Sequence, residues 1–547
     1  MVSLKGVVAK ANSRLTIKLA ASLLAASTLI SSLLGLYRDR LLNSLYMPNA
    51  VTGSPGYKVG IDAYTIAFTI PDFLFFILVS GALSVTFIPV FNQRLASGNK
   101  KSAWEISTSM INLMALITLA ASVFIMVFAD PLVRYVVGPG LDESGRALAI
   151  SMMRVLAVSP FLFAISTVIA SMQQAVGRFA FYALAPTIYN IGIIIGALFF
   201  AGGISIFGVQ IFEGGIMGVA LGVVLGAIMQ LIVSSIGLIG FGFDYHFKIY
   251  GRNKGFRKVL SLLPARSLDQ GIDYLNNIVE MNLASRMASG TARLYNQVLT
   301  LHMVPINLIG VAISTAAFPK MTERLSQGRP DLFRSELQSV LRVIIWLALP
   351  VSVITFFARG YLVSFLFNGG NALAANLLGV MVVAILFRTI YHIAARSFYA
   401  QQDTKTPLYI SLVSISLNIA LAVWMTMHLN MGPYGLALAQ SIVAFVEVMI
   451  LFAVMSRRIP KLFDAVFIHA IARMVSATGF MAIVSYFSVA TLQLAITDQS
   501  FLATFPKFAL ITIISFGAYL WFSSILKLEE PRPVIKTMSK LLFGRVR

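Results

Sequence analysis

The sequence predicts an all-α, polytopic membrane protein with about fourteen transmembrane helices. Hydrophobic residues make up 58% of the 547 residues and charged residues only 12%, whereas soluble proteins carry about 25% charged residues. Apolar runs long enough to cross a bilayer recur along the whole chain. Helices are expected there, because a helix satisfies every backbone polar group within its own segment.

The apolar runs place the predicted helices in order along the chain. The first six lie at residues 15–38, 61–91, 103–129, 146–175, 181–201 and 215–243. The next six lie at residues 268–292, 298–319, 338–358, 372–400, 407–428 and 433–456. The last two lie at residues 468–490 and 502–526.

An internal repeat relates the first six helices to the next six. The aligned residues keep a nearly constant offset, which unrelated apolar helices would not show. Pro89, Arg94 and Gly98 pair with Pro319, Arg324 and Gly328 at an offset of 319 − 89 = 230. Gln173, Gln174 and Asn190 pair with Gln401, Gln402 and Asn418 at an offset of 418 − 190 = 228. Gly218 pairs with Gly435 at an offset of 435 − 218 = 217. We therefore expect two pseudo-symmetric lobes, residues 1–250 and 251–460, followed by residues 461–547 with two further helices and a basic tail.

The net charge of +21 follows the predicted topology. Lys and Arg gather before the first helix, after the second, between the sixth and seventh, and in the C-terminal tail, whereas residues 130–146 and 426–434 carry little positive charge. This pattern predicts that both termini lie in the cytoplasm. Because membrane topology accounts for the basic residues, we expect membrane lipids and not nucleic acid as partners.

No sequence motif of a catalytic site is present. The chain lacks a nucleophile elbow, a zinc-protease motif and a phosphate-binding Gly-rich loop with Lys, and it has no cysteine. The sequence thus predicts a transporter and not an enzyme, with no cofactor. Transport would use a Na⁺ or H⁺ gradient or the membrane potential, or run passively.

Basic residues in or beside the predicted spans are candidate phosphate ligands, since a guanidinium donates two parallel hydrogen bonds to phosphate oxygens. The alternative is that these side chains reach out to the membrane surface, which we expect of Arg286 and Arg293 near helix ends. The candidate ligands are Arg38, Arg154, Arg388 and His392.

Acidic and amide residues in the spans are candidates for gating or ion coupling, because a buried charge is costly in a bilayer. The seventh helix places Asp269, Asp273, Asn276, Asn277 and Glu280 on one face. That face either lines a cavity with a Na⁺ or H⁺ site or holds helices together through hydrogen bonds. The gating and coupling candidates are Asp72, Asp273, Glu280, Asn418 and Glu447, with a possible Na⁺ site near Asp273, Glu280 and Asn418.

Five motifs in chain order resemble the MurJ/MviN lipid II flippase family of the multidrug/oligosaccharidyl-lipid/polysaccharide exporter superfamily. They are residues 34–39 (LGLYRD), 62–71 (DAxxxAFxxP), 81–89 (GAxSxxFxP), 178–191 (RF with APTxxNI) and 398–407 (FYAxQDxKTP). The resemblance implies fourteen helices in the bacterial inner membrane, with a V-shaped central cavity and a lipid-tail groove on the last two helices.

The implied function is alternating-access transport of undecaprenyl-pyrophosphate-linked peptidoglycan precursor (lipid II) from the inner to the outer leaflet, for peptidoglycan biosynthesis, the cell wall and cell shape. A monomer is expected, with other cell-wall synthesis proteins as further partners. Arg38 and Asp62 match family positions for substrate binding and the outer gate. Other family cavity cations are replaced here, by Ser32, Thr69, Phe75, Phe76 and Thr300, and an expected acid after Asn418 by Ala422.

The missing cations leave two other transport functions open. The chain could be a flippase for another polyprenyl-linked glycan, because it has fewer cavity cations than the resemblance implies and these cations would contact the headgroup. It could instead be a cation-coupled exporter of small molecules, with the carboxylates of the seventh helix as the coupling site. A membrane scaffold without transport is the remaining alternative, and it predicts that Arg38 and Asp62 are dispensable.

Overall fold

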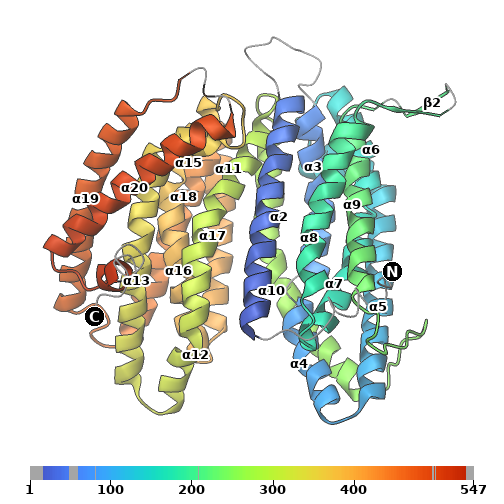
Figure 1. Cartoon of the computed structure of the whole chain (residues 1–547), viewed down its shortest axis with the longest axis horizontal. Coiled ribbons are helices and arrows are strands. Elements are labelled where there is room, and N and C mark those ends of the chain that lie inside the picture. Colours follow the sequence, from blue (N-terminus) through green and yellow to red (C-terminus); the bar gives the residue numbers. More distant parts are fainter. Residues whose placement is uncertain are drawn as a thin grey trace, which may run out of the picture. The chain divides into compact units, whose positions relative to one another are not determined.

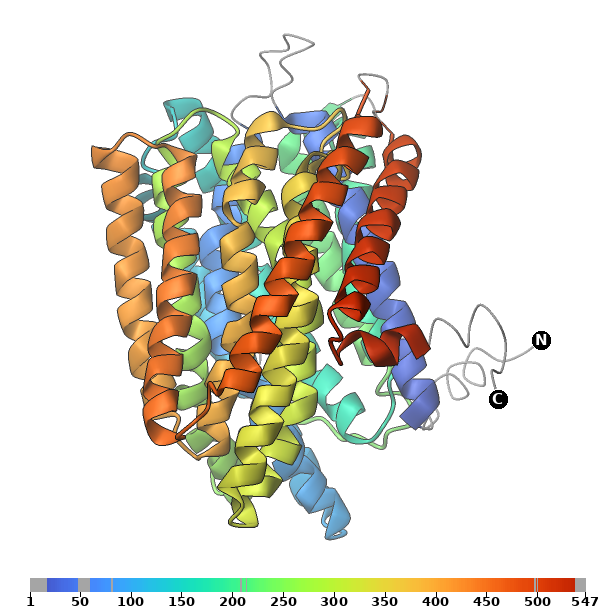
Figure 2. The same ribbon diagram turned by 90° about the vertical axis from the view of Figure 1, so that its left-hand side faces the viewer.

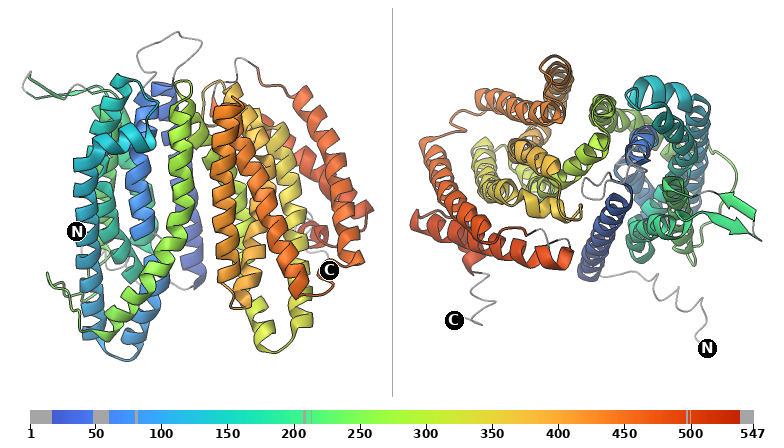
Figure 3. Two further views of the ribbon diagram at one scale, coloured as in Figure 1. Left: turned by 180° about the vertical axis from the view of Figure 1, so that it is seen from behind. Right: turned by 90° about the horizontal axis from the view of Figure 1, so that it is seen from above.

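The computed structural model describes residues 17–47, 60–79, 82–206, 209–212, 214–495, 498 and 500–536. The chain divides into two compact units, Met1–Arg293 and Leu294–Arg547. Within each unit the described residues form helices that run side by side (Figures 1 and 3). This confirms the predicted all-helical, multi-span fold.

The first unit holds the helices of the predicted first half and most of the seventh. In chain order they are α2 (Ile17–Tyr46), α3 (Gly60–Leu78), α4 (Ala82–Ala96), α5 (Lys100–Pro131), η1 (Leu132–Val137), α6 (Glu143–Leu156), α7 (Ser159–Ala175), α8 (Ala180–Ile195), η2 (Gly196–Phe200), α9 (Ile216–Ile236) and α10 (Lys254–Ser285). A short antiparallel hairpin of β1 (Ile204–Ile206) and β2 (Val209–Phe212), which the sequence did not predict, extends from this unit.

The second unit holds the remaining helices. α11 (Thr291–Pro305) begins at the boundary, and after it come η3 (Ile306–Val311), α12 (Ala312–Ser326), α13 (Pro330–Phe357), α14 (Arg359–Ser364), α15 (Ala372–Val380), α16 (Val382–Ala400), α17 (Lys405–Val423), η4 (Trp424–His428), α18 (Pro433–Arg458), α19 (Ala465–Thr491) and α20 (Phe501–Ile525).

Each of the fourteen predicted ranges is occupied by a helix or by consecutive helices. In the described part of the chain, eleven helical segments are long and apolar enough to cross a membrane, or twelve if α15 and α16, bent by 44°, form one span. α2 and α10 are not among them. α10 mixes acidic and basic residues along its length, which lowers its hydropathy below that of its neighbours.

The repeated residues build the same helix end in both units. α4 and α12 have equal lengths of 15 residues and are related by the predicted offset of 230. Each ends in a turn whose glycine, Gly98 or Gly328, has a φ near 70°, a conformation that favours glycine. In both turns an N–H five residues along, that of Asn99 or Arg329, donates to an arginine carbonyl at 3.0 Å.

Two further repeated features show where the offset changes. Gly215 and Gly432, related by the predicted offset of 217, both have positive φ and immediately precede α9 and α18. After α7 and α16, however, the matching positive-φ residues are Gly177 and Gln402, so this turn has an offset of 225 and not the predicted 228. The offset of 228 returns at η2 and η4.

Glycines bring α8 and α9 into close contact. A Cβ at Gly192 would lie 2.2 Å from the Cα of Gly226, and one at Gly222 would lie 2.6 Å from the Cα of Gly196. Small residues spaced four apart allow the backbones of membrane helices to approach this closely. The contact fixes α8, which carries a residue of the candidate site described below.

The last two helices pack on α13 and lie side by side (Figure 2). Their buried core includes Trp346 and Tyr519, and the Tyr519 hydroxyl donates to the Trp346 carbonyl at 3.0 Å. Beyond α20, Glu530 accepts a hydrogen bond from Nε of Arg342 at 2.6 Å. These contacts attach α19 and α20 to the second unit.

Candidate functional site

Arg38 lies on α2 and is held by residues of two helices of the first unit. Its Nη1 donates to Oδ1 of Asn190 on α8 at 2.8 Å, and its Nε and Nη2 donate to Oδ1 of Asp39 at 3.2 and 3.0 Å. Asn190 is itself oriented by its own Nδ2, which donates to the carbonyls of Ser31 and Pro186. The guanidinium is therefore fixed in place while its side chain stays 23% exposed.

Asp39 is shared by two arginines. Nη2 of Arg293 donates to the same Oδ1 at 3.2 Å, and Nε of Arg293 donates to Oδ1 of Asn43 at 2.9 Å. Arg293 is only 5% exposed, so the prediction that it reaches out to the membrane surface is wrong. A buried guanidinium needs a counter-charge and acceptors, and Asp39 and Asn43 supply both.

Asp62 lies in the first turn of α3 and binds the backbone that begins α11. Its Oδ2 accepts the N–H of Gly290 at 2.5 Å, and its Oδ1 accepts the N–H of Arg293 at 2.9 Å. The first N–H groups of a helix have no partner within the helix and carry a partial positive charge, which favours a carboxylate there. Asp62 is buried; with Arg38, Asp39, Asn43 and Arg293 it forms what we call the Arg38 cluster.

Asp72 and a row of aromatic rings border the Arg38 cluster. Asp72 lies further along α3 and is close enough to Arg38 for their charges to interact. Phe75 and Phe76, which stand where the resemblance placed cations, pack against other aromatic rings. The ring contacts are Phe76 with Tyr274 at 4.2 Å, Phe75 with Phe163 at 5.4 Å, and Phe163 with Tyr189 at 5.1 Å.

The second unit contains a separate ion pair, in which the carboxylate is buried and the arginine is partly exposed. Nη1 of Arg388 on α16 donates to Oε2 of Glu447 on α18 at 2.9 Å, and Glu447 is 2% exposed. The other carboxylate oxygen, Oε1, accepts the hydroxyl of Ser411 on α17 at 3.0 Å, and that hydroxyl also meets the Tyr391 hydroxyl at 3.1 Å. Three helices thus meet at this pair, which brings together two of the predicted residues.

His392 and Asn418 lie on two of the same helices. His392 follows Arg388 by one turn on α16, and its ring contacts that of Tyr391 at 5.6 Å. Asn418, the repeat counterpart of Asn190, is buried on α17. Arg396, two turns after Arg388, donates to the Val311 carbonyl at 3.1 Å and to the Ser314 hydroxyl at 2.9 Å. One face of α16 therefore carries Arg388, His392 and Arg396 at intervals of one turn.

One polar contact of the predicted face of α10 lies within the helix itself. Glu280 is buried and accepts Nδ2 of Asn276 at 3.0 Å, one turn earlier on the same helix. Nδ2 of Asn282, which lies outside the predicted face, donates to the Val136 carbonyl of η1 at 2.6 Å. The side chain of Asp273 lies outside the described residues.

Two predicted residues are exposed at the surface of the first unit. Arg154 on α6 donates Nε to the Met126 carbonyl on α5 at 3.3 Å and so is not part of the Arg38 cluster. Arg286 is exposed and donates to Oδ1 of Asn282 at 3.1 Å, as expected for an arginine at a helix end. Within the residues that the structure describes, no three His, Cys, Asp or Glu side chains lie close enough to hold a metal ion.

Sequence reasoning missed Asp39 and Arg293 as members of the site. Asp39 was visible only as part of a motif, although a carboxylate inside a span requires a cationic partner. Arg293 was assigned to the membrane surface because it lies near a helix end. Its partner Asp39 is 254 residues away in the chain, and only the fold shows that they meet.

Comparisons with known proteins point to one family. Residues 56–506 match the family model described as lipid II flippase MurJ. A probable lipid II flippase MurJ of Thermotoga maritima is 24% identical over 520 residues, which cover 93% of this chain and 96% of that protein. The lipid II flippase MurJ of Burkholderia cenocepacia is 25% identical, covering 79% of this chain and 82% of that protein.

Solved structures share the fold. A lipid II flippase MurJ in an inward closed conformation is similar with a TM-score of 0.72 at 24% identity, covering 94% of this chain and 99% of that chain. An inward-facing multidrug resistance MATE family transporter of the MOP superfamily is similar with a TM-score of 0.63 at 15% identity, covering 80% of this chain and 96% of that chain. At these identities the likeness concerns the fold alone.

Proposed function

Because the chain belongs to the MurJ lipid II flippase family, we propose that it moves undecaprenyl-pyrophosphate-linked peptidoglycan precursor from the inner to the outer leaflet by alternating access. The observation that carries this proposal is the Arg38 guanidinium, which is fixed by Asp39 and Asn190 yet remains partly exposed. A guanidinium held in this way matches the paired oxygens of a pyrophosphate.

Arg38 is the proposed contact to the pyrophosphate, and Arg293 is a positioning residue. Arg38 is 23% exposed at the side chain and Arg293 only 6%, so an incoming phosphate meets Arg38 first. The phosphate oxygens would replace the Asp39 carboxylate as acceptor of Nε and Nη2. Arg293 keeps Asp39 neutralised during this exchange, and Asn190 keeps Nη1 pointing in the same direction.

Asp62 is the proposed gate residue. Its carboxylate ties the start of α3 to the backbone N–H groups of Gly290 and Arg293. Charge-assisted hydrogen bonds of this kind contribute about 1.5–3 kcal/mol each, which is large enough to bias a conformational equilibrium. Breaking and re-forming them would couple movement of α3 to movement of the segment that begins α11.

Coupling to an ion gradient is assigned to the ion pair of the second unit. Binding of a cation beside Glu447 would replace Arg388 as the counter-charge of this carboxylate. The other proposed coupling residues are Asp72, Asp273, Glu280 and Asn418. Arg154 and His392 are proposed as further phosphate contacts.

The remaining proposals concern the setting of the protein. We place it in the bacterial cytoplasmic membrane with both termini in the cytoplasm. The working lobes are residues 1–250 and 251–460, and residues 461–547 serve the lipid tail. Contacts with other cell-wall synthesis proteins and a monomeric state belong to the same proposal.

The test is rescue of lipid II transport in a bacterium whose own flippase is depleted. Wild-type protein should restore lipid II in the outer leaflet, whereas Arg38→Gln should not. Arg134→Gln is the matched control, since the Arg134 side chain is 38% exposed and pairs with Asp130 at 3.4 Å. Failure of wild-type protein to restore outer-leaflet lipid II, despite normal membrane insertion, would refute the assignment.

A second candidate, transport of another polyprenyl-linked glycan, is favoured by one observation. Phe75 and Phe76 form part of a row of packed aromatic rings where the resemblance placed cations. Proteoliposomes supplied with each lipid-linked donor separately would distinguish the two substrates. Faster translocation of a donor other than lipid II would replace the first assignment by the second.

A further inference from the structure

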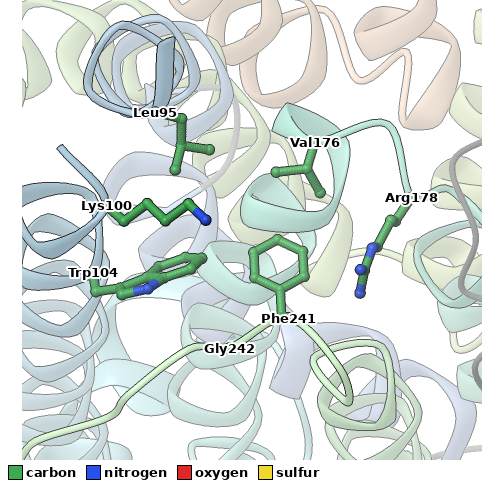
Figure 4. Close-up of a pocket in the computed structure, with 7 residues that line it drawn as sticks. All are labelled: Leu95, Lys100, Trp104, Val176, Arg178, Phe241 and Gly242. Atoms are coloured by element: carbon green, nitrogen blue, oxygen red, sulfur yellow. The ribbon is translucent and has the colours of Figure 1, made fainter. Parts of the chain in front are cut away.

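A pocket of about 320 Å³ lies in the first unit and shares no residue with the Arg38 cluster. It is formed where the start of α5, the turn between α7 and α8, and the segment after α9 come together (Figure 4). Its walls combine two basic side chains with aromatic and aliphatic ones, namely Lys100, Arg178, Trp104, Phe241, Leu95 and Val176.

The positive charge of its lining residues makes the pocket suitable for an anionic ligand. Lys100 and Arg178 line it and no acidic residue does. Among the described residues, neither cation is in a salt bridge, because the ion pairs of this unit involve other side chains. Lys100 is also the first residue of α5, where the helix dipole adds a partial positive charge.

Contacts within the first unit orient the Arg178 side chain before a ligand binds. Its Nη2 donates to the Gly240 carbonyl at 3.2 Å and its Nη1 points to the Ile239 carbonyl at 3.5 Å. The guanidinium also lies over the Phe241 ring at 5.0 Å. These contacts use two of its five N–H groups, so the side chain is oriented before a ligand arrives while other donors remain for phosphate oxygens.

The aromatic wall distinguishes a lipid from a free ion. The rings of Trp104 and Phe241 lie 5.4 Å apart, and both face the pocket (Figure 4). Tryptophan side chains favour the level of lipid headgroups, where one part of the ring is apolar and the other meets water. An inorganic phosphate would leave this wall unused, whereas the glycerol and the first acyl carbons of a phospholipid would cover it.

We propose that this pocket binds the headgroup phosphate of an anionic glycerophospholipid, with Lys100 and Arg178 as the phosphate ligands and Trp104 and Phe241 as the contacts to the glycerol region. The neighbouring basic residues Arg94 and Lys101 attract the same lipids to this face. The site lies apart from the proposed substrate contact and does not depend on which lipid-linked glycan the protein transports.

Fluorescence of Trp104 tests the proposal directly. In full-length protein with Trp346→Phe, Trp424→Phe and Trp521→Phe, Trp104 is the single tryptophan. Brominated phosphatidylglycerol should quench it more strongly than brominated phosphatidylcholine at equal mole fraction. Lys100→Gln and Arg178→Gln should each weaken the apparent phosphatidylglycerol affinity about fivefold, as expected for one cation near a membrane surface. The matched control, Arg134→Gln, replaces a cation that does not line the pocket and pairs with Asp130.

The outcomes separate the lipid from other ligands. Equal quenching by the two lipids, or quenching that survives the double Lys100→Gln, Arg178→Gln variant, would overturn the proposal. Displacement by millimolar inorganic phosphate would show a phosphate site and would also overturn the lipid assignment. If the single-tryptophan protein fails to fold, phosphatidylglycerol should still raise the thermal stability of the protein with all four tryptophans, and less so that of the double variant. No difference there would contradict the site.

Discussion

Replacing Asp39 by Asn tests whether the Arg38 cluster is held by charge or only by hydrogen bonds. The substitution keeps an oxygen that can accept from Arg38 and Arg293, but it removes the one counter-charge that both share. A neutral hydrogen bond between membrane helices contributes about 0.6 kcal/mol on average. Breaking a buried ion pair costs about 3–5 kcal/mol, because a charge is left without a partner. Since Arg38 is partly exposed, we expect the low end, about 3 kcal/mol.

The assay is a double-mutant cycle on the free energy of unfolding in mixed detergent micelles. Arg293→Gln removes the buried cation, so adding it to Asp39→Asn should recover more than half of the lost stability. The control Asp130→Asn breaks an exposed pair that is 46% and 38% exposed at its two side chains, and should cost less than about 1 kcal/mol. An Asp39→Asn cost below about 1 kcal/mol, or no recovery in the double variant, would refute the ion-pair account.

Three further predictions follow from other contacts. Gly222→Ala places a methyl group 2.6 Å from the Gly196 Cα and should lower the free energy of unfolding by about 1–3 kcal/mol, whereas Gly202→Ala, with nothing within 4 Å, should not. Glu447→Ala leaves Arg388 without its counter-charge and should lower the free energy of unfolding by about 3 kcal/mol. Ser411→Ala removes one hydrogen bond to Glu447 and should lower it by about 1 kcal/mol. Equal losses of stability would contradict the ion pair. The Thr406 hydroxyl donates to Asp403 and lowers the pKa of that carboxyl from 3.8 to about 2, so its contribution to stability is present above about pH 4 and is lost as the pH falls toward 2. Asp403→Asn should flatten acid unfolding in that window, and an unchanged pH profile would refute the contribution.

The helices could be predicted because a bilayer requires long apolar helical segments. The turn after α4 and its copy after α12 could also be predicted, since Gly98 and Gly328 repeat at a fixed offset and both adopt positive φ. The segments η1 to η4 are π-helices, and they could not be predicted from the sequence, because a single extra residue in a helical turn leaves no signature in hydropathy. The offset change at Gly177 and Gln402 was missed for a similar reason, as identical residue types suggested a different alignment.

The candidate site was predicted in part. Arg38 and Asp62 stood out because a charge inside an apolar segment needs an explanation, and both are in the cluster. Their partners could not be found in the same way, since the contact from Asp62 to Gly290 joins residues 228 apart in the chain. Glu447 and Arg388 were predicted as separate candidates for coupling and for substrate, and only their 2.9 Å contact shows that they act on each other.

Binding of a lipid-linked pyrophosphate to Arg38→Lys protein tests whether Arg38 is the pyrophosphate ligand. Lysine keeps the positive charge but cannot donate two parallel hydrogen bonds to the phosphate oxygens. The variant should therefore bind a short-chain lipid II analogue at least about tenfold more weakly than wild-type protein. The loss should shrink for a monophosphate-linked analogue, which offers fewer oxygens to the guanidinium. If Arg38→Lys binds the pyrophosphate analogue as tightly as wild-type protein, Arg38 is not the pyrophosphate ligand and the account is contradicted.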